Sequence, residues 1–198
     1  MYNAIQTQIT SEPATEPVSL AEAKLYLRVD SSDEDDLITS MIVSARQMIE
    51  NHLRSALITQ TRKMTLDDFP ASSSDVNKIE RLSNFQNIAI TELQGEAVIY
   101  LWPRPIQSIT SITTYNDNND ATVFSASLYR LDAANGRVVL NEGQVWPSDL
   151  RDESAVEVVY VCGYGAAGDV PEAIKQAIKM LIAQMYESRD KCEMTARS

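Results

Sequence analysis

Apolar residues recur at three- and four-residue spacing in two long stretches near opposite ends of the chain. The first runs from Asp35 to Arg54, and the second runs from Pro171 to Asp190. This spacing predicts two amphipathic helices, and their apolar stripes are expected to pack against each other. The apolar positions are Leu37, Ile38, Met41, Ile42, Ala45, Met48, Ile49 and Leu53 in the first stretch, and Ile174, Ala177, Ile178, Leu181, Ile182 and Met185 in the second.

Between the two helices the pattern changes to that of short strands. Asn135-Gly136 separates two of the segments and predicts a tight hairpin turn, because both residues tolerate positive φ. Residues 71–96 are polar and irregular, and no element is predicted there. The predicted strand segments, rich in β-branched residues and bounded by turn residues, are ALITQTRKMTLDDFP, EAVIYLWP, IQSITSITTYND, SLYRLD, RVVLNEG and AVEVVYVC.

A capping box predicts a third, short helix over about residues 20–27, in which Ser19 and Glu22 cap each other's free amides. Residues 1–17 contain few large apolar side chains, so they are expected to form an extended arm that needs a partner to become ordered. The order of elements predicts an α+β fold. A small helical core of two long amphipathic helices and a short N-terminal helix receives an inserted antiparallel β-sheet block.

The predicted organisation has three parts. An arm covers residues 1–17, a domain covers residues 18–190, and a tail without an apolar stripe covers residues 191–198. Within the domain, the helical core comprises residues 18–55 and 170–190, and the β-rich insertion comprises residues 56–163.

Composition excludes several classes of function. The chain has 198 residues and a net charge of −11, which disfavours a protein that reads DNA sequence through contacts with phosphate. It contains no apolar run of the length that spans a bilayer, and its N-terminus lacks the basic and apolar regions of a signal peptide. The expected location before use is therefore the cytosol. Cys162 and Cys192 have no metal-binding spacing and are expected to be free thiols.

One motif invites an enzymatic interpretation. Gly163, Gly165 and Gly168 form a G-x-G-x-x-G after a predicted strand, which is the pattern of a dinucleotide-binding loop. Pro171 delays the helix, however, and no second strand follows to supply an acid for a ribose. Asp169 also places a negative charge where a phosphate would bind. The preferred interpretation is a strand, a glycine-rich reversal and a helix started by proline, with no cofactor.

Two further groups of residues are candidates for centres of chemistry. The acidic residues Asp33 to Asp36 suggest a metal site, but neighbouring positions on a helix fan out around its axis and do not converge on one ion. Their charge instead suits the start of a helix. His52 is the single histidine and lies at a helix edge without a nucleophile motif to partner it. We therefore predict no catalytic, cofactor or metal site.

Taken in order, the segments resemble a known family. VSLAEAKLYLRVD, DDLITSMIVSARQMIENHLRSALITQT, LWPRPIQSITSITTYND, LYRLDAANGRVVL followed by VWP, VEVVYVCGYG and VPEAIKQAIKMLIAQMYESRD cover about residues 18–190. This ordered set is similar to the head-tail connector, or adaptor, family of long-tailed bacteriophages and gene transfer agents. The sequence departs from that pattern in the polar stretch between Pro70 and Ala97 and in its N-terminal arm.

The resemblance implies a structural protein without catalysis. Members form a ring, usually dodecameric, that docks beneath the portal, extends the DNA channel and offers a surface to the tail-side neck protein. It also implies that the helical cores pack side by side around the ring, in the neck of the virion, after a period in the host cytoplasm. An acidic lumen suits this role because it lets DNA slide without binding it. Two alternatives remain open: a soluble assembly chaperone, and a small nucleotide-binding enzyme that uses the loop from Gly163 to Gly168.

Two sets of residues are candidates for contacts with other proteins. The first is the end of the last helix and the tail, where residues without an apolar stripe gain order only by docking, so this end is predicted to meet the portal. The second set is predicted to contact neighbouring proteins, with packing inside the chain as the alternative for its two tryptophans. The portal candidates are Glu187, Arg189, Lys191, Met194 and Arg197, and the neighbour candidates are Trp102, Arg104 and Trp146.

Overall fold

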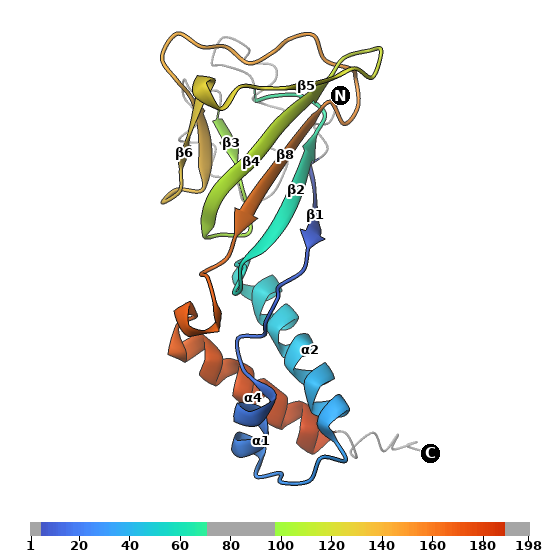
Figure 1. Cartoon of the computed structure of the whole chain (residues 1–198), viewed down its shortest axis with the longest axis vertical. Coiled ribbons are helices and arrows are strands. Elements are labelled where there is room, and N and C mark those ends of the chain that lie inside the picture. Colours follow the sequence, from blue (N-terminus) through green and yellow to red (C-terminus); the bar gives the residue numbers. More distant parts are fainter. Residues whose placement is uncertain (1–4, 71–97, 189–198) are drawn as a thin grey trace, which may run out of the picture. The chain divides into compact units, whose positions relative to one another are not determined.

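The structure is a computed structural model that describes residues 5–70 and 98–188. The chain divides into two compact units (Figure 1). The helical unit comprises residues 13–59 and 163–198, and the β unit comprises residues 1–12 and 60–162. The β unit is therefore inserted into the helical unit in the sequence, and the mixed α+β class predicted from the sequence is confirmed.

Three helices form the helical unit. They are α1 (Leu20–Leu27), α2 (Asp35–Leu53) and α4 (Glu172–Ser188), and all three pack against one another. The apolar stripes of α2 and α4 meet as predicted, and their buried side chains form one core with residues from α1 and from both chain connections. This core contains Val18, Ala23, Ile38, Met41, Ile42, Ala45, Ile49, Leu57, Ile58, Val170, Ile178 and Ile182.

The capping box that starts α1 is present as predicted. The amide of Glu22 donates to Ser19 Oγ at 3.2 Å, and the amide of Ser19 donates to Glu22 Oε2 at 2.8 Å. The bonds from Ser19 hold the pKa of Glu22 below its ordinary value. The helix ends at Arg28, which adopts the left-handed conformation with φ 60°. These two local devices explain why so short a helix has defined ends.

A buried ion network joins the chain before α1 to α2. Arg46 is 3% exposed, and its guanidinium donates to Glu16 Oε2 at 2.8 Å and to Glu50 Oε2 at 2.9 Å. The other oxygen of Glu50 accepts a hydrogen bond of 2.8 Å from the amide of Leu57. Burial alone would lower the pKa of Arg46, but its bonds to the two carboxylates outweigh burial and raise it. The network therefore attaches two segments to α2: the segment before α1, through Glu16, and the segment after α2, through Leu57.

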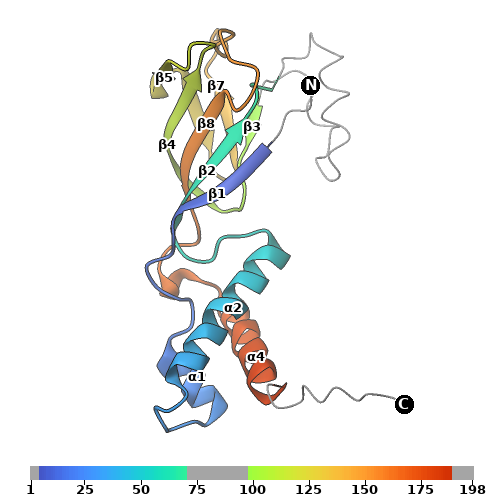
Figure 2. The ribbon, with the colours of Figure 1, turned by 90° about the vertical axis from the view of Figure 1, so that its right-hand side faces the viewer.

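Two antiparallel sheets form the β unit (Figures 1 and 2). The larger sheet has the order β1-β2-β8-β4-β5 and the smaller has the order β3-β7-β6. The strands of the larger sheet are β1 (Ile5–Ser11), β2 (Gln60–Leu66), β8 (Val156–Cys162), β4 (Ile106–Tyr115) and β5 (Ala121–Val123). Those of the smaller sheet are β3 (Val98–Tyr100), β7 (Arg137–Leu140) and β6 (Tyr129–Asp132).

The core of the β unit follows from alternation along its strands. In β8 every second residue is buried, from Val156 through Val158 and Tyr160 to Cys162. The smaller sheet covers this face, and the hydroxyl of the buried Tyr160 donates to the carbonyl of Trp102, which follows β3. Burial raises the pKa of Tyr160, in keeping with a hydroxyl held inside the unit as a hydrogen-bond donor. A period-two apolar pattern has thus produced a two-layer core.

The structure corrects two expectations from the sequence. Part of the predicted arm, Ile5–Ser11, pairs along β2 as the edge strand β1, so for these residues no partner protein is required for order. Asn135-Gly136 lies within a four-residue turn between Asp132 and Arg137, and only Gly136 has positive φ. The side chain of Asp132 bonds to Asn135 and Arg137 across this turn. The predicted hairpin is therefore confirmed, but the positive φ expected of Asn135-Gly136 occurs at Gly136 and not at Asn135.

Gly163 allows the chain to reverse after β8. Its φ is 123°, and a Cβ built there would lie 2.4 Å from the carbonyl oxygen of Ile58. Beside this contact, the amide of Thr59 donates to the carbonyl of Gly165 at 2.9 Å. The backbone that leaves β8 therefore lies directly against the backbone that leads into β2, and no side chain fits between them.

Gly163→Ala is expected to lower the free energy of unfolding by about 2–4 kcal/mol, because it combines a strained backbone with a backbone clash. The matched control is Gly168→Ala, since nothing lies within 4 Å of a Cβ built at Gly168 and its φ is not positive. Chemical denaturation of the three proteins makes the comparison. Equal stability of the two variants would contradict this account of the reversal.

Arg46→Ala is expected to destabilise the protein by about 3–5 kcal/mol, because it leaves Glu50 buried without its cation. Lys63→Ala serves as the control, since Lys63 pairs with Glu157 at 2.8 Å while a quarter of each side chain stays exposed. A loss of less than about 1 kcal/mol is expected for that pair. Thermal and urea unfolding measure both effects, and a similar loss in both variants would count against the special role of the buried network.

Candidate assembly surfaces

The side chain of Asp169 occupies the space beside the glycine-rich loop. The Asp169 carboxylate accepts a hydrogen bond of 2.8 Å from the amide of Ala166. A Cβ built at Gly165 would lie 2.3 Å from Asp169 Oδ2, so that carboxylate lies against the glycine backbone. A short 3-10 turn follows, and α4 begins only at Glu172. The position that a phosphate would take in a dinucleotide-binding loop is therefore held by an anion of the protein.

The other candidates for chemistry are dispersed. In residues 5–70 and 98–188 no group of three His, Cys, Asp or Glu side chains gathers as a metal site would require. Asp35 bonds to Lys24 at 2.6 Å, and Glu34 accepts a hydrogen bond from the hydroxyl of Tyr186. His52 is exposed in the last turn of α2. The acids at the start of α2 thus serve local contacts with the neighbouring helices.

Neither the cysteines nor the helices indicate a further site in the described residues. Cys162 is buried in β8 and forms no disulfide with any residue that the structure describes, and Cys192 lies outside the described residues. No helix in the described part of the chain is both long and apolar enough to cross a lipid bilayer.

Trp146 packs inside the β unit. Its ring stacks on Phe69 with centroids 4.4 Å apart and an interplanar angle of 6°, and it lies 5.3 Å from the ring of Phe124. Phe124 in turn stacks on Tyr129 at 6.0 Å. The half-buried Trp146 is therefore held by an aromatic cluster, and the residue next to it, Val145, is 79% exposed.

Trp102 and Arg104 lie together between β3 and β4. Each precedes a cis proline, and Trp102 is half-buried whereas Arg104 is exposed. A Cβ built at Gly136 would lie 2.8 Å from Arg104 Nε, so the arginine side chain lies over the β6–β7 turn. In the part of the chain that the structure describes, Trp102 makes no ring contact with the Trp146 cluster. The three neighbour candidates thus do not form one aromatic surface.

At the C-terminal end, Glu187 is exposed in the last turn of α4. The other four portal candidates lie outside the described residues: Arg189, Lys191, Met194 and Arg197. A shallow hollow beside Glu187 is bordered by Tyr26 from α1 and by Ala177 and Met180 from α4. The hydroxyl of Tyr26 accepts a hydrogen bond of 3.4 Å from the side-chain amide of Gln176, which joins the two helices at this surface.

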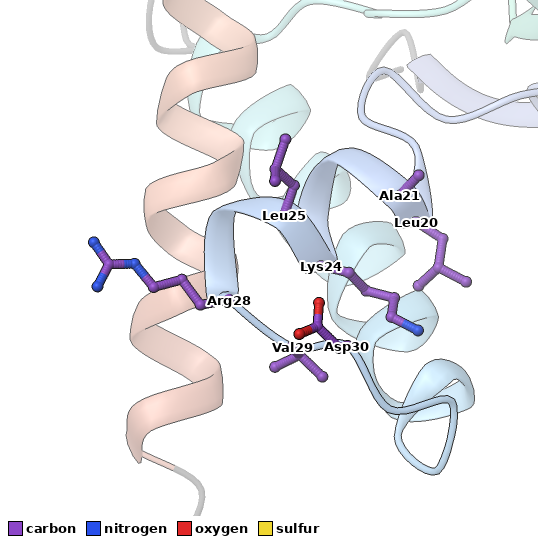
Figure 3. Close-up of a pocket in the computed structure, with 7 residues that line it drawn as sticks. All are labelled: Leu20, Ala21, Lys24, Leu25, Arg28, Val29 and Asp30. Carbon is purple, nitrogen blue, oxygen red and sulfur yellow. The ribbon is translucent and has the colours of Figure 1, made fainter.

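A second hollow lies on α1 itself (Figure 3). Leu25 and Arg28 project from one side of the helix, and Leu20 and Lys24 project from the other. Leu25 is 82% exposed, although Leu20, Ala23 and Leu27 of the same helix contribute to the core. A helix with apolar residues on both its inner and outer faces is typical of one that is covered on both sides.

These exposed apolar residues were not predicted from the sequence: Leu25 lines the hollow on α1, and Tyr26, Ala177 and Met180 line the hollow beside Glu187. The signal was present in the segment LAEAKLYL, where only Glu22 and Lys24 are charged. Both of those side chains are engaged, one in the capping box and the other in the bond to Asp35. No other charged residue lies within α1, and the exposed Arg28 at its C-cap lines the same hollow as Leu25.

Comparison with known structures shows a shared fold. A chain in the "Neck of empty GTA particle computed with C6 symmetry" aligns with a TM-score of 0.70 and 20% identity, covering 92% of this chain and 84% of that one. A chain in the "Virion of native gene transfer agent (GTA) particle" aligns with a TM-score of 0.68 and 17% identity, covering 98% and 88%. A third, from the "Neck of native GTA particle computed with C12 symmetry", gives 0.61 and 20%, covering 90% and 84%.

Sequence comparison identifies the family. No curated protein matches the chain significantly. The family model described as head completion protein matches residues 16–197, which include α1, α2, α4 and every strand except β1. Since that match extends over nearly the whole chain, the resemblance to head-tail connectors noted in the sequence is confirmed, and the chain belongs to the head completion protein family.

Proposed function

We propose that this protein is a structural subunit of a head-tail neck, where copies form a ring beneath the portal. The observation that carries the proposal is the family match over residues 16–197. The fold supports it, because similar chains occur in gene transfer agent necks computed with sixfold and twelvefold symmetry. A dodecamer is the proposed ring, located in the virion neck after assembly and in the host cytoplasm before it.

The proposed role is mechanical and involves no catalysis. The ring extends the DNA channel, binds the portal on one side and receives a tail-side neck protein on the other. A net charge of −11 on each copy favours a conduit along which DNA slides without sequence-specific binding. The loop that most resembles a cofactor site supports this view, because Asp169 already fills it.

Contacts with the partners are assigned as follows. The end of α4 at Glu187 and the tail residues Arg189, Lys191, Met194 and Arg197 are proposed to meet the portal. In the β unit, Trp102, Arg104 and Trp146 are proposed to contact neighbouring proteins. Of these three, Arg104 is the most accessible to another protein because it is exposed, whereas Trp146 already stacks on Phe69.

The mass of the purified protein, alone and mixed with its portal, tests the proposal. Light scattering is expected to show either a discrete ring or a discrete complex that forms only with the portal. The second result would mean that the ring is templated on the portal. A monomer that ignores the portal at every salt concentration would refute the proposed function.

Truncation after Asp190 tests the portal assignment. The helical core ends before Asp190, so the shortened protein is expected to keep the thermal stability of the full chain. Its attachment to filled heads is expected to be lost, as measured by co-sedimentation with heads and by counting tailed particles. Normal tailed particles formed by a stable truncated protein would show that residues 191–198 are not required at the portal.

A further inference from the structure

One edge of the larger sheet is open in the described part of the chain. The sheet order begins with β1, and β2 pairs along one side of that strand only (Figure 2). The amides and carbonyls on the other side of β1 therefore have no ladder partner among the described strands. Such an edge is a template on which a further strand can pair.

β1 is the longest edge strand among the described strands of the β unit. It has seven residues, whereas the other edge strands, β5, β3 and β6, have three, three and four. Its sequence IQTQITS contains no charged residue and no proline, which are the usual devices that keep an edge from pairing. Gln6 and Gln8 are exposed, and Ile9 is 36% exposed. The strand is thus long enough to pair and lacks the residues that would prevent it.

The sequence of β1 is suited to pairing with a second copy of itself. Residues 5–9 read IQTQI, which is the same in both directions, with Thr7 at the centre. They are also the regular part of the strand, because the register with β2 shifts after Ile9. In an antiparallel pair of two such strands centred on Thr7, Gln6 of one copy lies opposite Gln8 of the other, and isoleucine lies opposite isoleucine.

This register keeps the two faces of the sheet distinct. Thr7 pairs with Met64, which is 1% exposed, so Thr7 lies on the face directed toward the core. Gln6 and Gln8, one position away on either side, lie on the outer face. Residues directly opposite each other share a face, so the glutamines of two copies would meet on the outer face, where their side-chain amides can bond. A shift by one residue would place glutamine toward the core.

The charges near β1 lie beside the strand and not within it. On β2, Lys63 bonds to Glu157 at 2.8 Å, and Arg62 donates a hydrogen bond within its own strand. The closest acids along the chain are Glu12, just after β1, and Asp67, just after β2. Each copy carries a net charge of −11, so two copies repel each other. Association through this edge is therefore expected to strengthen as added salt screens the repulsion.

We infer that two copies of the free protein pair through β1 into a dimer with its twofold axis at Thr7. Because both copies use the same strand, the contact is isologous and closes at two, unlike a ring contact in which each copy uses two different surfaces. The dimer covers the edge that would otherwise recruit other chains. β1 lies outside the residues 16–197 that the family model matches, so the contact does not follow from membership of that family.

Combined Gln6→Glu and Gln8→Glu substitutions test the contact. They place like charges opposite each other across the twofold axis, whereas within one copy Gln8 lies opposite Lys63, so a carboxylate there suits the pairing with β2. The dissociation constant of the dimer is expected to rise by about tenfold or more. The matched control combines Ala121→Glu and Val123→Glu, with the same charges at the same spacing on the exposed β5. Sedimentation equilibrium at several salt concentrations gives the constants, and thermal melting verifies folding.

Disulfide trapping tests the register. Gln6→Cys protein and Gln8→Cys protein, each also carrying Cys192→Ser, are oxidised separately and as an equimolar mixture. A linked dimer is expected in the mixture, because positions 6 and 8 of two copies lie opposite each other with Cβ atoms about 5 Å apart. Each variant alone is the control, since identical positions are displaced along the strands to roughly 7–8 Å. Non-reducing electrophoresis and mass spectrometry of the linked peptide identify the product.

Four outcomes would overturn the inference. They are a wild-type protein that stays monomeric at the highest concentration, an association that salt weakens, an acidic variant that associates like the wild type, and single cysteine variants that link as fast as their mixture. None of these results refutes the proposed function, which does not require β1 to pair between copies. Failure to bind the portal, by contrast, would refute the proposed function and leave the measured dimer unaffected.

Discussion

The structure depends on a close backbone contact between two segments far apart in the sequence. The helical unit is built from two pieces separated by the whole β unit, and they meet where the amide of Thr59 donates to the carbonyl of Gly165. Only a glycine at position 163 allows this approach, because a Cβ there would overlap the carbonyl of Ile58. The contact brings α2 and α4 together and continues the pairing of Gln60 with Cys162. The helical core therefore depends on this reversal, because α2 and α4 come from segments on opposite sides of the β unit in the sequence.

Features set by neighbouring residues were predictable from the sequence, and features set by distant ones were not. The capping box at Ser19, the stripes of α2 and α4 and the alternation of β8 each follow from a local pattern, and the structure contains all of them. The pairing of β1 with β2 depends on a partner far along the chain, and nothing in residues 5–11 specifies it. The same limit applies to Trp146, whose stacking on Phe69 joins distant segments. Exposure of Leu25 also follows from packing rather than from its position in the sequence.

The glycine motif shows how local sequence can mislead about a site. Three glycines after a strand match the spacing of a phosphate-binding loop, but here only two of them make room for a neighbouring group, and the two groups differ. Gly163 gives room to a neighbouring carbonyl, and Gly165 gives room to the carboxylate of Asp169. A Cβ built at Gly168 would meet nothing within 4 Å. The motif acquires chemical meaning only when the helix that follows presents its free amides to a ligand, and here an aspartate of the protein caps the turn.

The position of the insertion has a consequence for how such proteins diversify. The chain leaves the helical unit at Gln60 and returns to it after Cys162, and these two residues are paired on adjacent strands. An insertion whose ends lie side by side is exchangeable without moving the elements that flank it. Lineages are thus free to replace this module while the helical unit keeps its own contacts. β1 sets a condition on that exchange, because the N-terminal strand has to find a matching edge on whichever module takes its place.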